Sequence, residues 1–160
     1  MYSPIEVQKF IVKQSNENKH GVQKMLQYRL YVIDDDKFIG EGLKRAFHDF
    51  DTSFSVTVFT DPSEGLRATL TSPPDLVFLD LFMPDINGEE ILKELKKKNI
   101  PTRVVVLTGI TDIAKVVEMI KNGACNYITK PFSPHEIIKV ARRTVVLEDT
   151  LDKVDPDKKQ

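Results

Sequence analysis

Between residues 28 and 148 the chain alternates two kinds of segment, short apolar ones and longer ones whose apolar residues recur at helical spacing. Several of the short segments are apolar along their whole length, which suits strands buried on both faces of a parallel sheet. The alternation therefore predicts an α/β fold with a doubly wound, five-stranded parallel sheet. The strand segments are YRLYVI (28–33), FSVTVFT (54–60), DLVFLD (75–80), TRVVVLT (102–108) and CNYIT (125–129).

Helix-start signals support this division of the chain. Asp36 precedes a run of apolar residues at helical spacing, and Asp61 precedes Pro62, which suits the first turn of a helix. Ser133 begins a similar signal, SPHE, before the last helix. The apolar stripe of Ile113, Val116, Val117 and Ile120 predicts a helix that buries this stripe in the core.

Polar residues follow four of the predicted strands at the point where each strand ends. Asp34, Asp35 and Asp36 follow the first strand, and the third strand ends in Asp80. Thr108 ends the fourth strand, and Lys130 follows the fifth. Because ligands of open α/β sheets bind at the carboxyl ends of the strands, we expect these side chains to converge on one site.

The residue types at this edge indicate phosphoryl chemistry with a hard cation. Neighbouring carboxylates repel unless a proton or cation lies between them, and an all-oxygen ligand set suits Mg²⁺. No His/Cys pattern in the sequence suggests zinc. Lys130 and Thr108 could bind phosphoryl oxygens, and an aspartate beside them could act as a nucleophile toward phosphorus.

Four motifs in this order, VIDDD, FLDLFMPDING, VVVLTG and NYITKPF, resemble the receiver domains of two-component response regulators over residues 28–148. The resemblance implies a flavodoxin-like, CheY-like fold with strand order 2-1-3-4-5. It also implies a phosphorylation-dependent switch in which a histidine kinase or histidine phosphotransfer protein phosphorylates Asp80. Such a switch catalyses only its own phosphorylation and dephosphorylation and is not an enzyme acting on other substrates.

The resemblance assigns a metal site and a switch. Mg²⁺ would be held directly by Asp35, Asp80 and the backbone carbonyl of Phe82, and largely through water by Asp34. Thr108 and Lys130 would contact the phosphoryl group, and the peptide bond from Lys130 to Pro131 would be cis. Tyr127 matches the aromatic residue that changes rotamer together with Thr108, or else it is a half-buried strand residue.

Three other functions fit this fold class less well. An aspartate-dependent Mg²⁺ phosphohydrolase usually carries a second aspartate two residues after the nucleophile, where this chain has Phe82. A flavodoxin-like cofactor binder would need a glycine-rich loop after the first strand, where this chain has an acidic one. A pseudo-receiver would lack some of the acceptor residues that are intact here.

Composition leads to expectations about partners and location. The net charge of −1 and the placement of the lysine run 93–99 at a helix end predict no nucleic-acid or membrane partner. The resemblance implies a downstream protein partner. The single cysteine and the lack of a long apolar run predict a cytoplasmic protein.

The two ends extend beyond the predicted domain. Residues 1–27 are expected to form an N-terminal helix, with Val7, Phe10 and Ile11 on one face, followed by a linker. Residues 149–160 are expected to be a tail or an extension of the last helix, where Leu147, Leu151 and Val154 could pair two chains in a homodimer. Since few residues follow the receiver segment, we expect a stand-alone receiver that serves as a relay intermediate, a phosphate sink or an output protein.

Overall fold

The computed structural model describes residues 27–109 and 111–154, with residues 147–154 as backbone. Five parallel strands form one sheet in the order β2-β1-β3-β4-β5, which confirms the predicted fold and strand order. The predicted N-terminal helix lies outside the described residues. The elements are β1 (Tyr28–Ile33), α2 (Lys37–Phe50), β2 (Phe54–Phe59), α3 (Pro62–Thr71), β3 (Leu76–Asp80), α4 (Gly88–Lys97), β4 (Arg103–Thr108), α5 (Ile113–Lys121), β5 (Asn126–Thr129) and α6 (Pro134–Val154).

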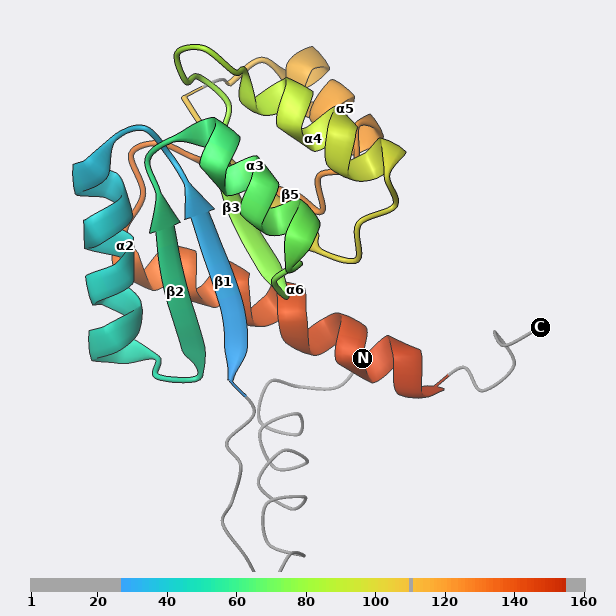
Figure 1. Ribbon diagram of the computed structural model, residues 1–160. Helices are drawn as coiled ribbons and strands as arrows, with labels where there is room; N and C mark the ends of the chain where they lie inside the picture. Colours follow the sequence, from blue (N-terminus) through green and yellow to red (C-terminus); the bar gives the residue numbers. More distant parts are fainter. Residues whose placement is uncertain (1–26, 110, 155–160) are drawn as a thin grey trace, which may run out of the picture.

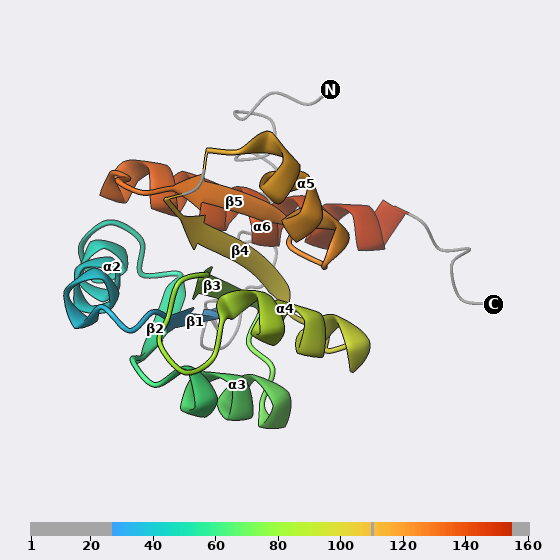
Figure 2. The ribbon, with the colours of Figure 1, turned by 90° about the horizontal axis from the view of Figure 1, so that it is seen from above.

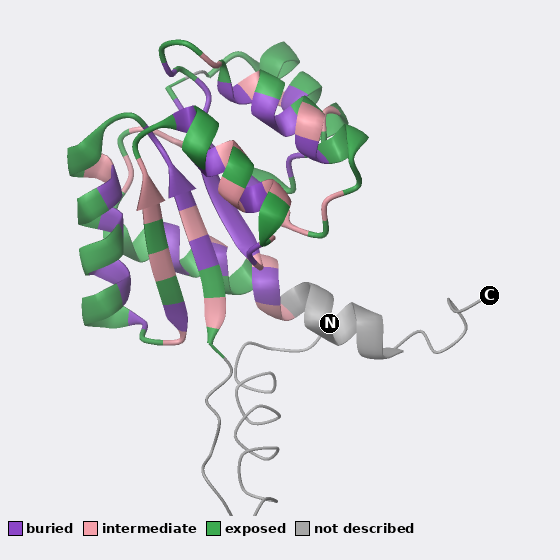
Figure 3. Ribbon diagram, in the orientation of Figure 1, coloured by how far each residue is buried: buried purple, intermediate pink, exposed green. Residues whose placement is uncertain are grey.

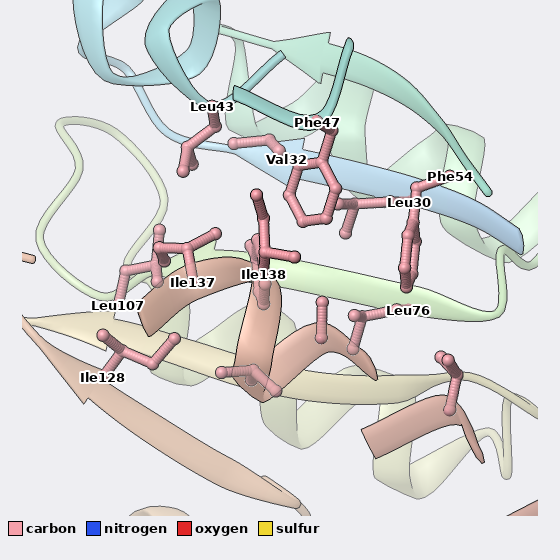
Figure 4. Close-up of a cluster of buried hydrophobic side chains, with 14 residues drawn as sticks. Leu30, Val32, Leu43, Phe47, Phe54, Leu76, Leu107, Ile128, Ile137 and Ile138 are labelled. Atoms are coloured by element: carbon pink, nitrogen blue, oxygen red, sulfur yellow. The ribbon is translucent and has the colours of Figure 1, made fainter. Parts of the chain in front are cut away.

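Helices cover both faces of the sheet (Figures 1 and 2). On one face, α2 and α6 contribute Phe47, Ile137 and Ile138 to a buried cluster with strand residues such as Leu30 and Leu76 (Figure 4). On the other face, α3, α4 and α5 pack over a second cluster. The two clusters explain why the central strands are apolar on both sides.

Strand β3 is the centre of the sheet, and all five of its residues are buried (Figure 3). It pairs with β1 on one side and β4 on the other. Edge strand β2, by contrast, has a mixed pattern of buried and exposed residues. A side chain at the end of β3 is therefore attached to the least mobile backbone that this architecture offers.

The helix-start signals are confirmed in the structure. The carboxylate of Asp36 accepts hydrogen bonds from the backbone amides of residues 38 and 39, and that of Asp61 accepts from those of residues 63 and 64. Asn87 and Asp112 cap α4 and α5 in the same way. The hydroxyl of Ser133 accepts a hydrogen bond from the amide of residue 136. Short polar caps thus set the points at which the chain leaves the sheet edge.

The prediction that the α5 stripe is buried is wrong for three of its four residues, whereas Val116 is partly buried against the second cluster. Ile113 is 79% exposed, and Val117 and Ile120 are each 46% exposed, while Met119 is the buried residue of this helix. Periodicity identified the helix but not the side that meets the sheet. Because α5 lies beside the edge strand β5 (Figure 2), the sheet covers only one of its sides, and three of the four stripe residues are exposed.

Among the described residues, no helix combines the length and apolar character that crossing a membrane requires.

A buried carboxylate joins α2 to α6. Asp51, the C-cap of α2, is only 6% exposed and accepts hydrogen bonds from the amide and hydroxyl of Ser53 at 3.1 and 2.6 Å. The Nε atom of Arg142 on α6 lies 2.5 Å from its other oxygen. Burial raises the pKa of Asp51, but the hydrogen bonds from Arg142 and Ser53 outweigh burial, so the pKa lies below its ordinary value.

We predict that Asp51→Ala lowers the free energy of unfolding by about 2–3 kcal/mol at pH 7, because it leaves hydrogen-bond donors at this site unpaired. Since folding lowers the pKa of Asp51, its contribution is complete above the ordinary value of about 3.9 and is lost as the pH falls through the folded value. Urea unfolding at pH 7 and at acid pH measures this. Asp49→Ala, two residues away on the surface, is the control; an equal loss in both variants would contradict the prediction.

Candidate functional site

The carboxyl ends of four adjacent strands bring the predicted site residues together. Asp34 follows β1, Asp80 ends β3, Thr108 ends β4 and Lys130 follows β5. Asp34 and Thr108 are fully buried, and Asp80 is 5% exposed. All parallel strands end at the same edge of the sheet, so residues far apart in the sequence meet there.

Three carboxylates form a cluster at this edge. Asp34, Asp35 and Asp80 each place a carboxylate oxygen within 4.8 Å of the others. Asp35 is exposed, whereas the other two are buried, so the cluster opens to solvent through Asp35. An all-oxygen donor set with one accessible side fits Mg²⁺, which retains several of its waters. The cluster is thus compatible with the predicted metal ion.

Lys130 neutralises part of this negative charge. Its Nζ atom lies 2.9 Å from Oδ2 of Asp34 and 3.3 Å from Oδ1 of Asp80. Its backbone amide donates a hydrogen bond of 2.8 Å to the carbonyl oxygen of Thr108, and the peptide bond to Pro131 is cis, as the resemblance implied. The lysine therefore connects the ends of β1, β3, β4 and β5.

The pKa values follow from burial and from these charges. Burial raises the pKa of Asp80 above its ordinary value, and the charge of Asp34 raises it further. Lys130 and the backbone amide of Phe82 oppose this increase but do not reverse it. Burial lowers the pKa of Lys130, yet the two carboxylates outweigh burial and the net shift is upward. Lys130 thus remains a cation, and the site still carries an excess of negative charge.

Gly88 holds the loop after Asp80 in place. Its amide donates a hydrogen bond of 3.0 Å to the carbonyl oxygen of Leu81. A Cβ atom on Gly88 would lie 2.1 Å from the carbonyl oxygen of Asp80 and 2.7 Å from Cα of Leu81. The start of α4 can approach this backbone only because residue 88 has no side chain. Sequence periodicity does not predict this contact.

The remaining predicted residues surround the cluster. The side chain of Phe82 is 60% exposed, and that of Tyr127 is 40% exposed. Tyr127 borders a pocket of about 230 Å³ that is also lined by Thr111, Ile113, Val116 and Thr129. The metal-ligand role of the Phe82 carbonyl and the rotamer change of Tyr127 remain predictions. Asp36 lies outside the cluster, although its amide donates to Oδ1 of Asp34 at 2.9 Å.

Comparison with known proteins identifies the family. The family model of the response regulator receiver domain matches residues 30–142. The chain belongs to this family. Receiver domains act in phosphorylation-dependent two-component signalling, which favours a signalling switch over a conventional enzyme.

Similar proteins support this assignment. The transcriptional regulatory protein QseB of Escherichia coli O157:H7 is 36% identical over 74% of this chain and 52% of its own length. The receiver domain of the Francisella response regulator 1452 is 33% identical, covers 78% of this chain and 99% of that one, and gives a TM-score of 0.69. The chemotaxis protein CheY4 of Vibrio cholerae, at 24% identity, gives 0.68 over 74% of this chain and 98% of its own.

The predicted absence of a nucleic-acid partner is corrected by these comparisons. A further relative, 35% identical over 73% of this chain and 50% of its own length, is the DNA-binding response regulator MtrA of Mycolicibacterium smegmatis. The chain spans about half the length of the curated relatives it matches. The prediction rested on the near-neutral charge of this chain, and the charge of a receiver segment does not report on DNA binding by response regulators.

We predict that Gly88→Ala is destabilising by about 1–3 kcal/mol, because the new methyl group forces the backbone of Asp80 and Leu81 to shift. Gly42→Ala is the matched control, since a Cβ atom there meets nothing within 4 Å. Alanine in that helix interior should stabilise by up to about 1 kcal/mol. Urea unfolding of both variants measures the difference, and similar midpoints would rule out the contact as a constraint.

Proposed function

We propose that this receiver domain accepts a phosphoryl group on Asp80 from a histidine kinase or a histidine phosphotransfer protein, with Mg²⁺, and that the modification alters its partner-binding face. The observation that carries the proposal is the position of Asp80. It is a buried carboxylate at the end of the central strand, 3.3 Å from the ammonium group of Lys130 and clustered with Asp34 and Asp35.

The chain's own groups account for the transfer. An oxygen of Asp80 attacks the phosphorus of a phosphohistidine, so that an O–P bond forms as the P–N bond breaks. The donor ring, protonated on its other nitrogen, leaves as neutral imidazole. Lys130 is positioned to pair with a phosphoryl oxygen, and the Thr108 hydroxyl could donate a hydrogen bond to another. Rigid attachment of Asp80 to β3 keeps the nucleophile in place.

The proposed metal site uses the same cluster. Asp35, Asp80 and the backbone carbonyl of Phe82 would hold Mg²⁺ directly, with Asp34 acting largely through water. When bound, the ion would supply positive charge that offsets the negative charge of the transferring group. The raised pKa of Asp80 is consistent with a need for additional positive charge at this site. It reflects burial and a neighbouring carboxylate, which Lys130 does not fully compensate.

We expect acetyl phosphate to add one phosphoryl group in the presence of Mg²⁺, detected by intact-mass spectrometry. Asp80→Asn should abolish the added mass while the protein remains folded. Asp35→Asn, which removes a metal ligand, should slow labelling roughly tenfold or more, equivalent to about 1.4 kcal/mol in the barrier.

The matched control for this experiment is Asp36→Asn. Asparagine keeps the helix cap, and Asp36 lies outside the carboxylate cluster, so labelling should be unchanged. Normal labelling of folded Asp80→Asn protein would refute the site assignment. Equal slowing in the Asp35 and Asp36 variants would refute the metal-ligand assignment.

We also expect the phosphorylated form to be long-lived. In this family the residues two positions beyond the acceptor and two beyond the threonine flank the path of the attacking water, and here they are Phe82 and Ile110. Neither side chain can hydrogen-bond or orient that water, although hydrolysis depends on its placement. Ile110 lies outside the described residues, and Phe82 is 60% exposed.

The double variant Phe82→Asn/Ile110→Glu should lose its phosphoryl group roughly tenfold faster, equivalent to about 1.4 kcal/mol in the barrier. The measurement is phosphoryl loss over time by intact mass after removal of the donor. Phe50→Asn, which replaces a phenylalanine that is also exposed, at 69%, at the far end of α2, is the control and should have the wild-type rate. Equal rates for wild type and the double variant would eliminate the apolar residues as the cause of a long lifetime.

A further inference from the structure

Four of the exposed apolar side chains of the described structure lie on two neighbouring elements, α5 and β5. Ile113, Val117 and Ile120 are spaced at i, i+4 and i+7 along one side of α5, and all three are at least 46% exposed. Tyr127, 40% exposed on the neighbouring strand β5, lies on the same edge of the sheet. We call these four residues the α5–β5 face; Figure 2 shows the two elements together at one end of the sheet.

The other large exposed apolar side chains are isolated. Phe38 and Phe50 lie in the first and last turns of α2, roughly 18 Å apart along the helix axis. Phe82 lies on the loop that follows β3. A contiguous apolar patch marks a binding surface more reliably than scattered residues do, so the α5–β5 face is the candidate.

A pocket lies within this face. Ile113 and Tyr127 belong to its lining, together with Thr111, Val116 and Thr129, and its volume is about 230 Å³. Sites for small molecules usually have volumes of about 300–1,000 Å³, so this pocket is better suited to one inserted side chain. An apolar face with a pocket of this size fits an amphipathic helix, which places one anchor in the pocket and lays its stripe along the face.

The chain itself contains a segment with this pattern. Val7, Phe10 and Ile11 are spaced at i, i+3 and i+4, and SPIE at residues 3–6 is a helix-start signal. A helix this short is marginal in water unless its apolar face packs on something. Residues 1–26 lie outside the described structure, so their packing partner has to be inferred from the free surfaces of the domain.

Strand register fixes how far the segment has to reach. Tyr127 on β5 pairs with Val106 on β4, which pairs with Leu79 on β3, which in turn pairs with Ile33 on β1. Ile33 lies five residues after Tyr28, where β1 begins. The face is therefore about 17 Å from Tyr28 in the direction of the strands. Since β5 is three strands from β1, it is also about 14 Å away across the sheet, so the direct distance is roughly 22 Å.

The connecting residues match this distance. Residues 12–27 separate the stripe from β1, and a coil of these 16 residues has an r.m.s. span of about 20–24 Å. Effective concentration is greatest when the r.m.s. length of a linker equals the distance to be bridged. Contact within one chain is thus favoured over contact with a second copy or another protein at the same face.

We propose that residues 3–11 dock on the α5–β5 face of the same chain, with Phe10 in the pocket and Val7 and Ile11 against α5. Docking covers the apolar residues that α5 leaves exposed. The inference does not depend on phosphorylation of Asp80.

The single cysteine permits a test on the full chain. Cys125 is exposed and lies two residues before Tyr127, so a nitroxide attached to it reports on the neighbourhood of the face. We expect it to broaden the backbone amide NMR signals of residues 5–11 in isotope-labelled protein. Val117→Asp and Phe10→Ser should each restore these signals to at least half of their intensity without the label.

The control variant is Phe38→Asp, which replaces a side chain that is 89% exposed on α2, and it should leave the broadening unchanged. In a second sample, isotope-labelled Cys125→Ser protein is mixed with nitroxide-labelled protein at natural isotope abundance. Unbroadened signals in the mixture support docking within one chain. The proposal would be overturned by any of three results: broadening in the mixture, no broadening in the sample of labelled wild-type protein alone, or unchanged broadening in the Val117→Asp variant.

Discussion

The ammonium group of Lys130, placed between two buried carboxylates, is the interaction on which the site depends. Asp34 is fully buried and Asp80 nearly so, and burying two carboxylates this close together is unfavourable unless a cation lies nearby. Lys130 comes from the far side of the sheet, after β5, and meets residues at the ends of β1 and β3. This contact requires the strand order of the sheet, since β4 alone separates β3 from β5.

The apolar character of the sheet also contributes to the site, because it holds Asp80 in place. All of β3 is buried between two hydrophobic clusters, so its last residue has little freedom to move. The Gly88 contact then fixes the backbone immediately after Asp80. The carboxylate that we propose as the phosphoryl acceptor is thus attached to the most constrained strand, and the loop beside it supplies the accessible side.

The fold and the positions of most site residues could be predicted from sequence, because the patterns that determine them are local. Strand and helix periodicity set the fold, and parallel strands bring their ends together, which placed Asp34, Asp80, Thr108 and Lys130 correctly. The exposed stripe of α5 could not be predicted, because an edge position in the sheet is a tertiary property that periodicity does not encode. The Gly88 contact is equally non-local. Net charge failed as a guide to nucleic-acid binding, because a receiver can be one part of a DNA-binding response regulator.

The site and the α5–β5 face are connected through two steps of the sheet. Asp80 pairs in register with Leu107, and the next residue, Thr108, pairs with Thr129, which lines the pocket. The amide of Lys130 donates to the carbonyl oxygen of Thr108 across the same ladder. If Asp80 is phosphorylated as proposed, the added charge acts first on Thr108 and Lys130, whose backbones flank Thr129. Thr129, in the wall of the pocket, is therefore bonded to Lys130 and paired in register with Thr108, which makes the structural connection between the site and the pocket short.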